Sequence, residues 1–153
     1  MPPRRSPASW WPLTQLPGLS DTDLTSLQAL GIDDTRALLR QAVDRDRQRA
    51  MAAELKLHEH HVRKWVALAD LARIPSVGIE YCGLLLHSGI ISTIQLAQQP
   101  AHKLHQQILR LQVRELHRRN LCPSLGTVTQ WILQARELCQ RPSAPLADRP
   151  PNR

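Results

Sequence analysis

Four residues near the middle of the chain, HEHH (58–61), are of the types that bind zinc in proteins. A zinc site on one helix needs two histidines four residues apart with a glutamate between them, and here position 62 is a valine. A second pair, His102 and His105, is three residues apart, and the sequence indicates no third ligand. We therefore predict no bound metal and expect these histidines to be polar surface residues.

No catalytic constellation can be recognised elsewhere in the chain. The sequence has no glycine-rich phosphate loop, no serine or cysteine nucleophile with a matching histidine motif, and no paired carboxylates in a plausible pocket. Cys82, Cys122 and Cys139 lack a Cys-x-x-Cys spacing, so we expect small buried hydrophobic residues in a reducing cytosol. We predict a protein that is not an enzyme and uses no cofactor and no small-molecule substrate.

A series of cations between residues 103 and 118 has the pattern of a surface that contacts phosphates. On a helix these side chains fall within about one third of the circumference, and aliphatic residues fill most of the rest. They are Lys103, Arg110, Arg114, His117 and Arg118. Guanidinium groups match phosphate oxygens, and a net charge of +7 suits a polyanion. One alternative is a solvated helix face. A membrane-surface helix ranks third, because the apolar face of this helix lacks Phe and Trp and is needed for the core, so we expect no membrane partner.

Two stretches of the chain match at a constant offset of 58 residues. Residues 16–39, LPGLSDTDLTSLQALGIDDTRALL, align without a gap on residues 74–97, IPSVGIEYCGLLLHSGIISTIQLA. Trp65 and Trp131 lie in a further match. A repeat of about sixty residues is one supersecondary unit that is present twice.

Each unit opens with an apolar residue, a proline and a tight turn, which we call the first hairpin (residues 16–20) and the second hairpin (residues 74–78). Proline ends a preceding helix, and glycine or serine permits the turn. The following helix should end at Gly31 or Gly89, each with a positive φ. The residues of the hairpin turns are Pro17, Gly18, Pro75 and Gly78.

These turns, each followed by a helix and Gly-Ile-x-x-Thr, resemble the signature of the helix-hairpin-helix superfamily. Residues 10–140 are similar to an uncharacterised bacterial family, common in cyanobacteria, that has two such units in tandem. The resemblance implies a hairpin whose backbone N–H groups hold a phosphate of duplex DNA. Each hairpin has only one of the two signature glycines, Gly18 with Ser20 and Ser76 with Gly78, and a bulkier residue restricts close approach of a backbone.

We expect an all-α protein in which two tandem helix-hairpin-helix units pack into one compact helical domain. The expected helices are near residues 21–30, 34–57, 60–73, 79–88, 92–98, 101–119 and 125–140. The first unit spans 10–60 and the second 61–140, between Pro-rich tails at 1–9 and 141–153 that we expect to be mobile. Because Trp131 repeats Trp65, we expect helix 125–140 to pack against residues 10–40 and to close the two units into one body.

Charge favours the second hairpin as the phosphate contact. Asp21 and Asp23 follow the first hairpin and would repel phosphate, whereas Arg73 precedes the second. The candidate nucleic-acid-binding residues are Arg73, Ser76, Gly78, Lys103, Arg110, Arg114 and Arg118.

We predict a non-enzymatic module in the cytoplasm that binds nucleic acid, duplex DNA favoured, through phosphate contacts without sequence specificity. The alternative is a protein–protein interaction adaptor with no nucleic-acid role, because tandem helix-hairpin-helix units also serve as docking surfaces.

Overall fold

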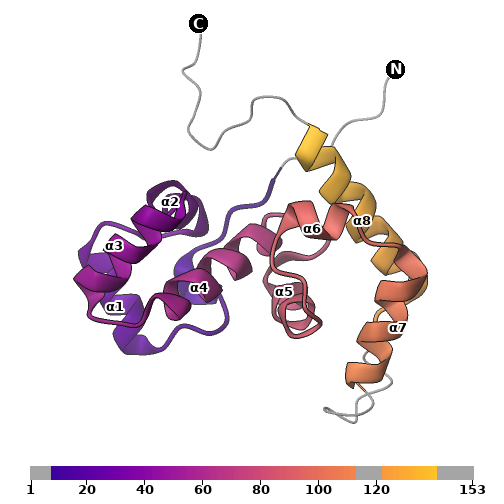
Figure 1. Cartoon of the computed structure of the whole chain (residues 1–153), viewed down its shortest axis with the longest axis horizontal. Helices are drawn as coiled ribbons and strands as arrows, with labels where there is room; N and C mark the ends of the chain where they lie inside the picture. The colour runs from indigo at the N-terminus through magenta and orange to yellow at the C-terminus, as the bar shows by residue number, and fades with distance from the viewer. Residues whose placement is uncertain (1–7, 113–121, 141–153) are drawn as a thin grey trace, which may run out of the picture.

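The computed structural model of the chain describes residues 8–112 and 122–140, and within these ranges the secondary structure is helical, apart from one isolated bridge between Pro12 and Asp34 (Figure 1). The fold class predicted from the sequence, all-α, is confirmed. In chain order the helices are the 3₁₀ helix η1 (Leu13–Gln15) and the α-helices α1 (Asp21–Ala29), α2 (Thr35–Gln41), α3 (Arg45–Leu55), α4 (Glu59–Ala72), α5 (Gly78–His87), α6 (Thr93–Ala97), α7 (Ala101–Leu111) and α8 (Leu125–Gln140).

Helix α4 lies at the centre of the molecule, with α1, α2 and α3 on one side and α5 to α8 on the other (Figure 1). It packs against α2 and α3 in the first half and against α5 in the second. Val62, Trp65 and Leu68 are buried, at the spacing expected for a helix with one apolar face. Because α4 contacts both halves, the expected unit boundary at residue 60 would separate most of α4 from α2 and α3, against which it packs.

Several apolar positions and one threonine position that lie 58 residues apart are buried alike. Leu27 and Leu85 are both fully buried. The same holds for the pairs Leu16 and Ile74, Ile32 and Ile90, Thr35 and Thr93, and Leu38 and Leu96, each at most 4% exposed. The φ angle is +82° at Gly31 and +94° at Gly89, which confirms the positive φ expected where each first helix ends.

The expectation of one helix over residues 34–57 is wrong, because the segment forms the two helices α2 and α3. The Asp44 carboxylate accepts the backbone N–H of Arg47 at 2.8 Å and caps the start of α3. An aspartate that caps the residues after it competes with a continuous helix, since its own backbone must be extended. Asp34 caps α2 in the same way through the N–H of Ala37.

The expectation that helix 125–140 packs against residues 10–40 is also wrong. Helix α8 packs on α6 and α7 and lies on the opposite side of α4 from α1 to α3 (Figure 1). The indole N–H of Trp131 donates to the carbonyl of Ser76 at 3.1 Å, so the tryptophan anchors α8 on the second hairpin. Helix α8 therefore takes the place in the second half of the chain that α4 takes in the first half.

The chain enters the fold through an extended segment before η1. The backbone N–H of Trp11 donates to Thr35 Oγ1 at 3.0 Å, and the N–H of Thr35 donates to the carbonyl of Trp11 at 2.9 Å. The Trp11 indole donates to the carbonyl of Ala72 at 3.0 Å. The entering segment is thus fixed both to the start of α2 and to the end of α4.

Candidate nucleic-acid interface

The first hairpin presents free backbone donors on the surface. Gly18 has a φ of +89° and is exposed, as is Ser20. Within residues 8–112 and 122–140, the backbone N–H groups of Gly18 and Ser20 have no acceptor, and that of Leu19 closes the turn over Pro17 and Gly18. The Ser20 hydroxyl accepts the N–H of Asp23 at 3.0 Å and so begins α1 directly after the turn. The amides of Gly18 and Ser20 are therefore available to a ligand.

Helix α4 places a cation beside these amides. A Cβ atom added at Gly18 would lie 3.7 Å from Cε and 3.9 Å from Nζ of Lys64, so the ammonium group lies next to the turn. The nearest atom to the same point, at 3.3 Å, is a methyl carbon of Leu68, which cannot accept a hydrogen bond. Arg63, beside Lys64 in the sequence, is also exposed. Backbone N–H groups next to an ammonium form a local environment that attracts an anion.

The second hairpin has a different backbone conformation and no free donor among Ser76, Val77 and Gly78. Its positive φ lies at Gly78, which aligns with Ser20, whereas that of the first hairpin lies at Gly18, which aligns with Ser76. The N–H of Ser76 donates to Oε1 of Gln134 at 2.8 Å. The N–H groups of Val77 and Gly78 both donate to the carbonyl of Ile74, at 2.9 and 3.0 Å. The amides predicted to contact phosphate are therefore already satisfied within the protein.

Aromatic residues also cover the second hairpin. Gly78 is buried, and a Cβ atom added there would lie 3.2 Å from the Trp11 ring. Trp131 packs on the hairpin from α8, and its ring centroid lies 5.0 Å from that of Tyr81. A phosphate backbone could reach Gly78 only if Trp11 moved away.

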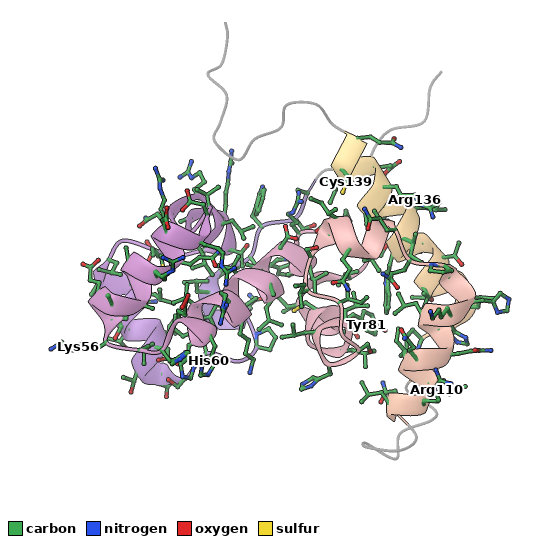
Figure 2. The ribbon with its side chains drawn as sticks, in the orientation of Figure 1. Lys56, His60, Tyr81, Arg110, Arg136 and Cys139 are labelled. Atoms are coloured by element: carbon green, nitrogen blue, oxygen red, sulfur yellow. The ribbon has the colours of Figure 1, made fainter. Side chains whose placement is uncertain are left out.

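The structure does not bring the remaining predicted residues to one surface. Arg73 Nε lies 2.9 Å from the Asp70 carboxylate in an ion pair that is about four-fifths buried, so its charge is already matched. Lys103 and Arg110 are exposed on α7, on the far side of α4 from the first hairpin, and Figure 2 shows Arg110 at the end of that helix. Arg114 and Arg118 lie outside the described residues.

The acidic residues after the first hairpin lie in the first turn of α1. Asp21 is exposed and Asp23 is partly exposed. A carboxylate in this position stabilises a helix through its macrodipole and at the same time lowers the attraction of the turn for phosphate. The first hairpin thus combines an attractive ammonium group with two repulsive carboxylates.

The histidines and cysteines do not form a second site. In the described part of the chain, no group of three or more His, Cys, Asp and Glu side chains is arranged to hold a metal ion. Desolvation, followed by the charges of His61 and His58, lowers the pKa of His60. Burial raises the pKa of the Cys82 thiol to about 11. Cys139 is exposed, contrary to the expectation that all three cysteines are buried.

A model of the family described as a domain of unknown function (DUF4332) matches residues 17–138. The chain belongs to this family. The match spans both hairpins and begins within the first. No curated protein and no solved structure matches the chain. In the described part of this DUF4332 chain, none of the helices has the length and apolar character needed to cross a membrane.

Proposed function

We propose that this DUF4332 chain is a non-enzymatic module that binds nucleic acid, duplex DNA favoured, through phosphate contacts without reading sequence. We place the contact at the first hairpin rather than at the second. The observation that carries the proposal is the exposed turn whose amides at Gly18 and Ser20 have no acceptor in the described structure, beside the ammonium group of Lys64.

Backbone amides and one ammonium group suit a phosphate because they supply hydrogen bonds and charge without contacting a base edge. Gly18 is exposed and has a positive φ, so the turn allows the sugar-phosphate backbone of a nucleic acid to approach closely. The net charge of +7 favours association with any polyanion. These features favour binding that is sensitive to salt and indifferent to sequence.

We also propose that each half is a helix-hairpin-helix unit: α1 and α2 follow the first hairpin, and α5 and α6 follow the second. The matched burial of Leu27 with Leu85 supports this assignment. In this interpretation the first unit makes the phosphate contact, and the second keeps the same fold with its hairpin closed by α8.

Fluorescence anisotropy of the full chain on a labelled duplex, across a salt series, tests the proposed function. The wild-type slope of log K against log salt should be about −0.9 for each phosphate neutralised. Lys64→Gln removes the charge beside the hairpin and should make the slope shallower by about one unit on unrelated sequences. Lys103→Gln is the matched control, because it removes one exposed lysine from α7 and should leave the slope unchanged.

Two outcomes would overturn the assignment. An absence of binding at low salt would remove the nucleic-acid function altogether. A slope that responds to Lys103→Gln and not to Lys64→Gln would transfer the contact to α7, where the sequence pattern alone had placed the cations.

A further inference from the structure

An open groove of about 600 Å³ crosses the middle of the molecule, over one face of α4. Its walls come from different halves of the chain. Ala42 and Val43, between α2 and α3, form one wall, and Leu86 and Ile91, around the α5–α6 connection, form the other. Ala67 lies on the floor. The groove therefore exists only because α4 holds the two halves side by side.

The groove has unusually exposed apolar side chains at its edges. Val43 is 56% exposed and Ile91 is 60% exposed, and both belong to the small set of large hydrophobic residues that face solvent in the described structure. Neither is needed to fill the core, since the buried cluster is formed by other residues. Exposed apolar side chains that gather around an open groove are typical of a surface that receives a partner.

The charges around the groove are positive. Arg63 and Lys64 line it from α4, and neither has a carboxylate within salt-bridge distance among the described residues. Asp70 is the only carboxylate in the lining that the structure describes, and it is held by Arg73 at 2.9 Å and by the N–H of Thr93 at 2.7 Å. An occupant must therefore match apolar walls and two unpaired cations.

We propose that the groove is a docking site for an acidic amphipathic helix of a partner protein. Apolar side chains on one face of that helix would contact Val43, Ala67 and Ile91, and its flanking carboxylates would lie near Arg63 and Lys64. This is the helix-in-groove mode of recognition, with charge complementarity setting the choice of partner. The function goes beyond phosphate binding, because it makes the chain an adaptor between a nucleic acid and a protein.

Charge complementarity also selects this occupant over the others. The terminal segments of the chain, 1–7 and 141–153, hold five arginines and one aspartate, so their charge has the wrong sign for the groove. A second copy carries a net charge of +7 and is repelled at long range. Nucleic acid fits the apolar walls poorly, since the lining offers no Phe, Tyr or Trp ring for base stacking and His60 is its one aromatic side chain among the described residues.

A phage-displayed library of random helical peptides of about 16 residues, roughly four turns, selected on the full chain, tests the proposal. The selected peptides should combine apolar residues at helical spacing with Asp and Glu. They should bind the variant Val43→Asp with Ile91→Asp at least about tenfold more weakly. Leu133→Asp is the matched control, because Leu133 is 52% exposed on α8 and lies outside the groove lining, and it should not change binding.

Three results would overturn the proposal. One is a selection that yields no binding peptide, or only basic ones. Another is equal binding to the wild type and to the double variant, with the fold of the variant checked by circular dichroism. The third is a wild-type dimer that the double variant dissociates, which would identify the occupant as a second copy.

The two proposed functions fail separately. Val43→Asp with Ile91→Asp should leave the salt slope of duplex binding close to that of the wild type, since neither residue lies at the first hairpin. Lys64 lines the groove and also lies beside that hairpin, so it is not used to test the groove.

Discussion

Gln134 accepts the backbone N–H of Ser76 at 2.8 Å, and this hydrogen bond distinguishes the second hairpin from the first. The α4 residue that takes the corresponding place in the first half is Leu68, with a methyl carbon 3.3 Å from the position of a Cβ on Gly18. An amide oxygen satisfies the hairpin donor, whereas a methyl group leaves it free for a ligand. One side chain on each packing helix thus decides whether this one donor is satisfied, while the N–H groups of Val77 and Gly78 are satisfied by the carbonyl of Ile74 within the turn.

Replacing Gln134 with Leu should destabilise the protein by about 1–2 kcal/mol, because it leaves the partly buried N–H of Ser76 without an acceptor. Urea unfolding followed by circular dichroism measures the change. Gln130→Leu, on the exposed side of the same helix, is the control and should stay within about 0.5 kcal/mol of the wild type. Equal stability of the two variants would mean that the hydrogen bond does not hold the hairpin.

Leu27→Ala and Leu85→Ala should each cost about 2–5 kcal/mol, because both side chains are fully buried at equivalent positions. Thermal or denaturant unfolding of the two variants under the same conditions makes the comparison. A severe loss for one variant and none for the other would show that the halves are not structural copies.

Gly31→Ala should cost about 1 kcal/mol through backbone strain, because the residue has a φ of +82°. Steric overlap does not contribute, since an added Cβ would meet no atom within 4 Å. Gly83→Ala is the matched control: the added Cβ also meets nothing, and the residue is inside α5 with no positive φ, so stability should rise by about 0.5–1 kcal/mol. Changes of the same sign in calorimetry would contradict this account.

Asp21→Asn combined with Asp23→Asn should strengthen duplex binding at low salt, with the gain shrinking as salt is added. The reason is that both carboxylates lie in the first turn after the hairpin amides. The same change should weaken α1 by about 0.3–1 kcal/mol for each residue through the lost macrodipole interaction. Anisotropy and thermal melting separate the two effects, and unchanged affinity would place the bound phosphate away from this hairpin.

The sequence was sufficient to predict the features that depend on local chemistry. The positive φ of Gly31 and Gly89 and the burial of Leu27 and Leu85 follow from the repeat. The break between α2 and α3 differs from the single helix expected over residues 34–57, and its local signal is Asp44, because an aspartate that can cap the next turn indicates a helix start.

The hydrogen bond that satisfies Ser76 depends on where α8 packs, which no local pattern determines. The signal that could have revealed it is the register of the two tryptophans. When Trp131 is aligned with Trp65, Gln134 aligns with Leu68. The second hairpin therefore has a hydrogen-bond acceptor where the first has a leucine. The same alignment indicates that α8 packs within its own half.

The central claim is that the first hairpin is open to phosphate and the second is closed. Titrating a short DNA duplex into the ¹⁵N-labelled full chain, and following backbone amide resonances by nuclear magnetic resonance, tests it most directly. The account predicts that the amides of Gly18 and Ser20 shift on binding while those of Ser76 and Gly78 do not. Shifts at Ser76 and Gly78 with none at the first hairpin would contradict it.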